Sequence, residues 1–213
     1  MRATHGCAWR MTPGARASPA CVLSGAATVC YTLPIANVVQ LGPCGEAMQL
    51  TLIASAAQVA LRRAPLAPGY ALRPTRAADR EALAELYLHA YAPHFVSTFA
   101  EAREEMGQTF AGAYGPLLPE LSPAVICDAA LVGAVQTVAQ APWPDTPPGP
   151  FIIEVMVRAE HRRRGLATAA LGWAARRALR RGHATLALRV ESANEGAVAL
   201  YRGLGFRDWT GRG

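Results

Sequence analysis

The strongest constraint on the fold lies in residues 151–168, where the pattern changes abruptly from strand-like to helix-like. Residues Phe151–Val157 are apolar except for Glu154 and rich in β-branched side chains, as expected of a strand covered on both faces. From Gly165 onward the apolar residues recur with helical period, at Leu166, Ala169, Ala170, Trp173 and Ala174. A strand, a glycine-containing turn and a helix in this order predict an α/β unit.

The turn between this strand and this helix carries three consecutive arginines, at residues 162–164. Gly165 allows a ligand to approach the backbone closely, and the helix that begins there directs unpaired amides and the positive end of its dipole outward. These features predict a site for phosphate groups, without a GxxxxGK[ST] loop. The competing interpretation is an ordinary solvated basic turn.

Composition narrows the choice of ligand. The chain has 213 residues, 52% of them hydrophobic, which suits one packed domain plus an extension. Its net charge is +6, and residues 158–181 contain eight arginines against a single acid, Glu160. A polyanionic ligand fits this patch. Nucleic acid binding is not expected, because Trp173 is the only aromatic residue between the arginines.

The five cysteines form no C-x-x-C pair, so no metal site is predicted.

Residues 1–69 differ from the rest of the chain, with one acid, Glu46, and six prolines. We expect a poorly ordered extension, or an over-long reading frame whose true start is Met48. Within it, residues 46–63 could form one helix, with the acid at its start and two arginines at its end. The uncharged run at residues 20–41 is too diluted by polar residues for a membrane span, so a cytoplasmic protein is expected.

Residues 70–213 read as the functional domain. We predict a strand at 70–74, helices at 76–91 and 94–110, a hairpin of strands 124–128 and 131–139, and a strand at 185–190. The proline-rich segment 141–150 cannot pair as a strand. The second helix carries three acids that are expected to form a solvated face; they are Glu101, Glu104 and Glu105.

A second informative stretch follows at residues 192–206. Asn194 and Tyr201 are separated by seven residues, two helical turns, so both lie on one helix face. The turn Arg162-x-x-Gly165-x-Ala167 resembles the (Gln/Arg)-x-x-Gly-x-(Gly/Ala) signature of the GNAT acetyltransferases. The run Asn194-x-x-Ala197-x-x-Leu200-Tyr201-x-x-x-Gly205-Phe206 is similar to the C-terminal motif of the same family. Both signatures occur in the family order, and the resemblance covers residues 70–213.

The resemblance implies an α/β fold of α+β type: a mixed, mostly antiparallel twisted sheet with helices on both faces and two central strands that splay apart to admit acetyl-CoA. It implies that strand amides hold the pantetheine arm and that the basic turn takes the pyrophosphate. The cofactor-binding residues would be Val155, Met156, Val157, Arg162, Arg163, Arg164, Gly165, Leu166, Ala167, Thr168 and Asn194. Tyr201 would be the general acid, and Glu154 the general base acting through water; alternatively, Glu154 is a strand carboxylate facing solvent.

The implied reaction is acetyl transfer from acetyl-CoA to a primary amine of a small molecule or a protein N-terminus. The alternative is an inactive acyl-CoA-binding module. One departure concerns the C-terminal end: family members finish with a two-stranded hairpin after the Gly-Phe pair, and only eight residues follow Gly205. The final strand is therefore expected to be short or missing, with the groove open, absent or completed by a second subunit, which makes a homodimer possible.

Overall fold

The computed structural model describes residues 21–24, 27–30, 48–62, 64–93 and 95–211. The chain forms two units, Met1–Leu33 and Pro34–Gly213. In the first unit, β1 (Cys21–Ser24) and β2 (Ala27–Cys30) form an antiparallel pair. The rest of the expected extension before residue 48 lies outside the described residues. Among the described residues, no helix has the length and apolar character needed to cross a membrane.

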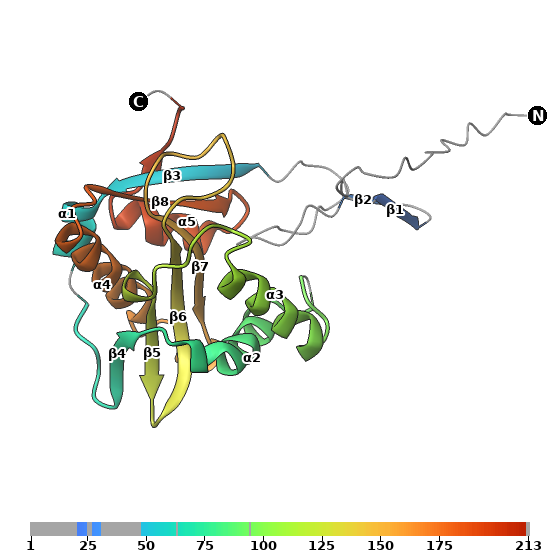
Figure 1. Ribbon diagram of the computed structural model, residues 1–213, viewed down its shortest axis with the longest axis horizontal. Helices are drawn as coiled ribbons and strands as arrows, with labels where there is room; N and C mark the ends of the chain where they lie inside the picture. Colours follow the sequence, from blue (N-terminus) through green and yellow to red (C-terminus); the bar gives the residue numbers. More distant parts are fainter. Residues whose placement is uncertain (1–20, 25–26, 31–47, 63, 94, 212–213) are drawn as a thin grey trace, which may run out of the picture. The chain divides into compact units, whose positions relative to one another are not determined.

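The second unit contains a seven-stranded sheet, shown in Figure 1. The order across the sheet is β4-β5-β6-β7-β8-β3-β9. All neighbours are antiparallel except β7 and β8, which are parallel, so the predicted mixed, mostly antiparallel sheet is confirmed. The strands are β3 (Gln49–Ser55), β4 (Tyr70–Pro74), β5 (Pro123–Cys127), β6 (Ala130–Val138), β7 (Phe151–Val157), β8 (Thr185–Glu191) and β9 (Arg207–Asp208).

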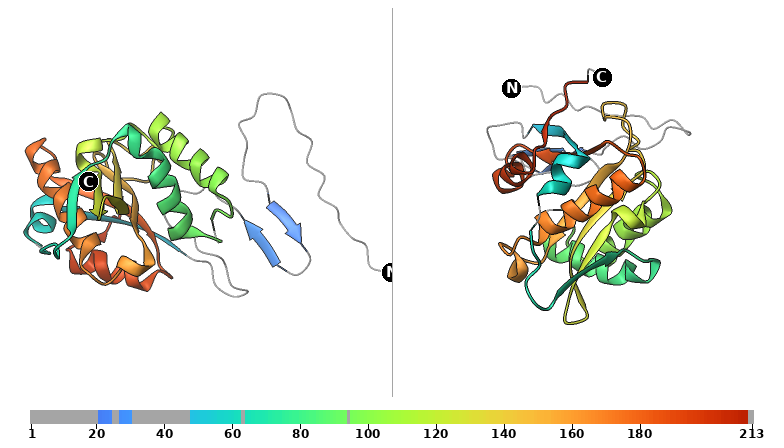
Figure 2. Two further views of the ribbon diagram at one scale, coloured as in Figure 1. Left: turned by 90° about the horizontal axis from the view of Figure 1, so that it is seen from below. Right: turned by 90° about the vertical axis from the view of Figure 1, so that its left-hand side faces the viewer.

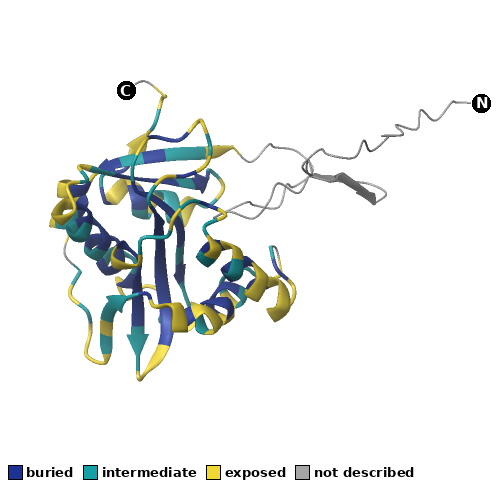
Figure 3. Cartoon of the chain, in the orientation of Figure 1, coloured by how far each residue is buried: buried dark blue, intermediate teal, exposed yellow. Residues whose placement is uncertain are grey.

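Helices cover both faces of this sheet, as predicted, and the central strands β6, β7 and β8 are largely buried between them (Figures 2 and 3). Helices α2 (Arg80–Tyr91) and α3 (Phe99–Ala111) pack on one face, in a cluster with Ala134 and Met156. Helices α1 (Ala56–Leu61) and α4 (Leu166–Arg180) share the cluster of the other face with Val135. Neighbouring residues of one strand thus face opposite layers. Helix α5 (Glu195–Gly203) packs against β8.

The helix predicted over residues 46–63 is wrong in its first half. Residues Gln49–Ser55 form β3, which pairs with β8 over seven residues, and only α1 is helical. The physical reason is the pairing with β8, in which Leu52 and Ala54 are buried and Ile53 between them is less buried. Residues 49–61, which the sequence assigned to the extension, belong to the sheet and its helical layer.

The remaining predicted elements agree with the structure within a few residues. The hairpin of β5 and β6 is confirmed, and its turn places Asp128 and Ala129 at positive φ, 47° and 67°. The helix predicted at 76–91 begins with a 3-10 turn at Ala77–Asp79 and continues as α2. The helix predicted at 94–110 begins only at Phe99, where Thr98 accepts a capping hydrogen bond from the Glu101 amide.

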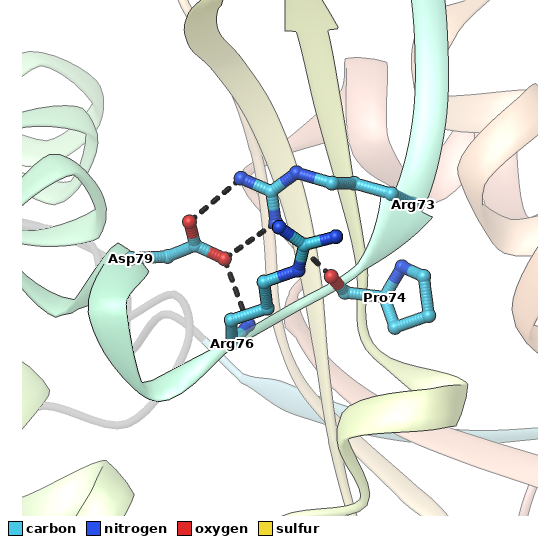
Figure 4. Close-up of polar contacts among 4 residues, drawn as sticks. All are labelled: Arg73, Pro74, Arg76 and Asp79. Carbon is cyan, nitrogen blue, oxygen red and sulfur yellow. Dashed lines mark hydrogen bonds and ion pairs between the residues drawn. The ribbon is translucent and has the colours of Figure 1, made fainter.

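One buried ion pair fixes the entry to α2 (Figure 4). Arg73 of β4 donates two hydrogen bonds of 2.7 Å to the two carboxylate oxygens of Asp79. The same carboxylate accepts the backbone N–H of Arg76 at 2.7 Å. Asp79 is buried, and the neighbouring guanidinium holds the pKa of its carboxyl below the usual value. The pair therefore ties the edge strand to the first helix of the α2/α3 layer.

Candidate active site

The central feature of the site is the separation of β7 from β8. Their parallel ladder contains only two residue pairs, Phe151 with Ala187 and Ile152 with Leu188. Beyond these pairs β7 continues to Val157, hydrogen-bonded to β6 on its other side. The predicted splay of the two central strands is thus present. Backbone groups at the end of β7 are left available to a ligand that adds as an extra strand.

A cavity of about 670 Å³ lies where the strands part. Its walls come from the end of β7, the basic turn, the start of α4, and helix α5, together with the end of α2. Of the predicted residues, those that line it are Val155, Met156, Val157, Arg162, Arg163, Gly165, Leu166, Ala167, Thr168, Asn194 and Tyr201. The fold therefore brings two sequence motifs to one cavity, although a helix and a strand separate them in the chain.

The basic turn has the backbone geometry of an anion site. Arg163 and Gly165 both adopt positive φ, 62° and 74°, which turns the chain sharply into α4. The first hydrogen bond of the helix runs from the Ala169 N–H to the Gly165 carbonyl, at 2.9 Å. Helix geometry therefore leaves the preceding amides, up to Thr168, without intrahelical partners. These donors and the helix dipole favour a phosphate at the cavity wall.

The three arginines of the turn differ in their contacts. Arg162 donates from Nε to the Val157 carbonyl at 3.0 Å, which fastens the turn to the end of β7. Arg164 contacts the Glu160 carbonyl at 3.4 Å, and it is the one predicted cofactor residue that does not line the cavity. All three side chains are exposed. Arg162 and Arg163 can therefore reach a polyanion without a large desolvation cost.

Asn194 and Tyr201 both face the cavity from α5. The Asn194 side-chain oxygen accepts the Ala197 N–H at 3.2 Å and so caps the helix, which leaves its amide nitrogen to donate elsewhere. Tyr201 is buried and packs edge-on against Phe206, 5.8 Å between ring centroids. Burial, and then the charge of Glu154, raises the pKa of Tyr201 well above its usual value. The phenol therefore keeps its proton at neutral pH.

Glu154 is buried in β7, with 3% of its surface exposed, so a solvent-facing strand carboxylate is the wrong interpretation. It does not line the cavity itself. Its Oε2 accepts a hydrogen bond of 2.5 Å from the hydroxyl of Tyr91, which does line the cavity. The carboxylate that the sequence predicts as a base is therefore joined to the cavity through a tyrosine.

Two cavity residues were not predicted from the sequence: Tyr91 at the end of α2, and Phe95, four residues beyond it. Their rings pack edge-on, with centroids 5.7 Å apart. The available signal for Tyr91 was its spacing of four from Tyr87, which places both rings on one face of α2. His161 was also missed; it lines the cavity and its Nδ1 is 2.9 Å from the Tyr70 hydroxyl.

The acids of α3 do not line this cavity. Glu101 accepts the Ser97 and Thr98 amides and caps the helix. Glu105, expected on the polar side, is 6% exposed, and burial raises the pKa of its carboxyl. Among the described residues there is no group of three His, Cys, Asp or Glu side chains that could hold a metal ion.

Comparison with known proteins agrees with this geometry. The model of a family described as the acetyltransferase (GNAT) family matches residues 80–206, which is more than half of the chain. The match includes β7, the basic turn and the Asn194–Phe206 motif. It leaves out β3, α1 and β4. No curated protein is detectably similar to this chain in sequence.

Solved structures share the fold at low identity. A GNAT-family acetyltransferase from Novosphingobium aromaticivorans is 23% identical with a TM-score of 0.51, over 76% of this chain and 60% of its own. The ribosomal-protein-S18-alanine N-acetyltransferase of Escherichia coli is 24% identical, TM-score 0.50, over 66% of this chain and 79% of its own. An aminoglycoside N-acetyltransferase in complex with CoA is 16% identical, with a TM-score of 0.51, over 67% of this chain and 93% of its own.

Other similar structures are longer than this chain. It covers 57% of a Staphylococcus epidermidis protein of unknown function and 47% of a Drosophila protein, with TM-scores of 0.56 and 0.51. At 11% and 14% identity these likenesses concern the fold alone.

Proposed function

The chain belongs to the GNAT family of acetyltransferases, and we propose that it transfers an acetyl group from acetyl-CoA to a primary amine of a small molecule or a protein N-terminus. The observation that carries this proposal is the shared cavity. It joins a strand end with open backbone groups, a basic helix N-terminus, and the side chains of Tyr91 and Tyr201.

Acetyl-CoA fits this cavity by the chemistry of its walls. The pyrophosphate would bind the amides of residues 163–167, the Thr168 hydroxyl, and the side chains of Arg162 and Arg163. The pantetheine arm would lie along the end of β7, with the Asn194 amide as a further donor. Backbone N–H groups near Val155–Val157 would then face the thioester carbonyl and stabilise negative charge that develops there.

Tyr201 is proposed as the general acid for the departing sulfur. Tyr201 lines the cavity, and burial raises the pKa of its hydroxyl, so the phenol is protonated at neutral pH. A phenol in that state donates a hydrogen bond, and then its proton, to a sulfur that gains negative charge.

The acceptor nitrogen needs a base. An amine with a pKa of about 10.4 is almost fully protonated at pH 7, and its deprotonation costs about 4–5 kcal/mol. Glu154 is proposed to take this proton, because it is the carboxylate connected to the cavity. We expect the reaction to take place in the cytoplasm.

The acceptor class is an amine in either of two forms. One structural neighbour is described as acetylating an alanine of a ribosomal protein, and another as an aminoglycoside acetyltransferase. For this chain, a small-molecule amine and a protein N-terminus are both proposed acceptors.

The test is a screen of acetyl-CoA against three amines: spermidine, kanamycin and a short peptide with N-terminal alanine. Release of free CoA is followed with a thiol reagent, and acetyl-CoA binding is measured separately by calorimetry. We expect binding and turnover with at least one amine, and Tyr201→Phe should lower kcat by about 10²-fold or more. Tyr87→Phe is the matched control, because Tyr87 is buried outside the cavity lining.

The two measurements separate the possible failures. Binding of acetyl-CoA without turnover of any amine would favour the inactive acyl-CoA-binding module. Absence of binding at millimolar acetyl-CoA would contradict the assignment of the cavity itself. Full activity of Tyr201→Phe would remove Tyr201 from the role of acid and leave the rest of the proposal standing.

A further inference from the structure

The connection between Glu154 and the cavity passes through one hydroxyl group. Glu154 is 3% exposed and absent from the cavity lining, whereas Tyr91 lines the cavity and contacts the carboxylate at 2.5 Å. An amine in the cavity therefore meets the tyrosine before it meets the base. A base that works through a loosely held water does not need such a tyrosine at this position.

The direction of this hydrogen bond decides what Tyr91 offers to a ligand. An ionised carboxylate only accepts hydrogen bonds, so the phenolic hydrogen lies between Tyr91 and Glu154. The lone pairs of the Tyr91 oxygen are then the part of the hydroxyl that can meet the cavity. This oxygen is an acceptor for N–H groups, and the negative charge of Glu154 behind it favours a cationic donor.

From this geometry, and resting on the proposed acetyl transfer, we propose that the Tyr91 hydroxyl binds the acceptor amine and relays its proton to Glu154. Tyr91 is thus the residue that selects a primary ammonium group for the site. The proposed role of Tyr91 is additional to that of Glu154 as a base, since the Tyr91 hydroxyl oxygen is the atom that contacts the acceptor nitrogen.

The surroundings of Tyr91 are suited to a relay. Phe95 packs edge-on against its ring, and Tyr87 lies 4.6 Å away between ring centroids. The titratable groups that face it are Glu154 on β7, Tyr87 on the same helix and Tyr201 on α5. Burial, followed by the charge of Glu154, raises the pKa of Tyr91 well above its usual value. A free phenolate is therefore avoided, and both proton movements must be coupled.

The step balances as follows. The ammonium nitrogen gives one proton to the Tyr91 oxygen, while the Tyr91 hydroxyl gives its own proton to Glu154. The nitrogen lone pair then attacks the carbonyl carbon of acetyl-CoA. The C–N bond forms, and the C–S bond breaks with its electron pair going to sulfur. The sulfur takes a proton from Tyr201, and the new amide nitrogen loses its second proton to solvent. Glu154 then releases its proton to solvent, and Tyr201 takes one from solvent, so that both side chains return to their starting states.

The test is the pH profile of Tyr91→Phe, measured with whichever of spermidine, kanamycin and the alanine peptide the wild type turns over best. At pH 7 we expect kcat/KM for the amine to fall by about 10²-fold. At pH 10, where the amine has lost its proton in solution, the variant should come within about fivefold of the wild type. A purely structural loss would lower kcat/KM equally at both pH values, and that result would overturn the proposal.

Two further variants make the test specific. Glu154→Gln should show the same pH-dependent loss, and the double variant should be no worse than either single variant, because the two groups act as one unit. Tyr87→Phe, the same change one helical turn away, should keep the wild-type profile. If Tyr91→Phe does not fold, a pH-independent loss in Glu154→Gln overturns the relay by itself.

The outcomes also separate this inference from the function on which it rests. Wild-type protein that turns over none of the three amines would refute the proposed function, and the relay with it. Wild-type turnover together with a parallel pH profile in Tyr91→Phe would refute the relay alone. Calorimetry should show acetyl-CoA binding unchanged in Tyr91→Phe, since the residues proposed to hold the cofactor lie on β7, the basic turn, the start of α4 and the N-cap of α5.

Discussion

Asp79→Ala tests the ion pair that holds β4 to α2. The substitution removes two charge-assisted hydrogen bonds of 2.7 Å from Arg73 and one of 2.7 Å from the Arg76 amide. Bonds of this kind contribute about 1.5–3 kcal/mol each in buried settings. The Arg73 side chain is 28% exposed and can recover part of its hydration. We therefore expect the free energy of unfolding to fall by about 2–3 kcal/mol at pH 7, measured by urea denaturation.

The pH dependence of this loss has a defined sign. The pKa of the Asp79 carboxyl is lowered in the folded protein, first by its hydrogen bond with Arg73. Its contribution to stability is therefore fully present above the ordinary aspartate pKa of about 3.9 and is lost as the pH falls through the lowered folded value. The difference between wild type and Asp79→Ala should shrink in that acid range.

Glu81→Ala serves as a control for the Asp79 experiment. Glu81 also contacts an arginine, Arg103, at 2.8 Å, with both side chains more than half exposed. Exposed pairs contribute about 0–1 kcal/mol, so this variant should lose little. An equal loss in both variants, or a loss in Asp79→Ala that stays constant down to pH 2, would refute the reasoning from burial.

Two further substitutions test the turn and the sheet. Gly165→Ala places a side chain at φ 74°, with its Cβ 3.3 Å from the Cβ of Ala64. The free energy of unfolding should therefore fall by about 1–2 kcal/mol, and calorimetry should show weaker CoA binding. Gly203→Ala is the control, because its Cβ would meet no atom within 4 Å and the substitution should have little effect. Leu52→Ala removes a fully buried side chain of β3 and should cost about 2–5 kcal/mol in urea unfolding, whereas a value near zero would show that β3 does not belong to the core.

Much of the site could be predicted because its signals are local. The positive φ at Gly165 and the unpaired amides after it follow from a strand–turn–helix pattern within 18 residues, 151–168. The same holds for Asn194, whose capping of α5 is a short-range effect. The hydrogen bond of Glu154 was harder to predict, because its partner Tyr91 lies on α2, 63 residues earlier in the chain. Sequence pattern carries no measure of such a contact.

The strand β3 shows the same limit more clearly. Residues 49–61, a strand of seven residues followed by a short helix, contain apolar residues spaced by two and by four. The acid before them, Glu46, and the arginines after them, Arg62 and Arg63, favoured the prediction of a helix. What decides in favour of a strand is pairing with β8, more than 130 residues later, where Leu52 lies opposite Leu188. Tertiary pairing of this range overrides local propensity.

This pairing also explains how the sheet tolerates an opening at its centre. Beyond two residue pairs, β7 and β8 are not paired with each other. β7 is still held by β6, and β8 is held by β3 along all seven of its residues. Each strand beside the cavity thus keeps one complete partner, and the backbone groups at the gap are the ones left for a ligand. The strand β3, which the family match does not include, therefore supports β8, which it does include.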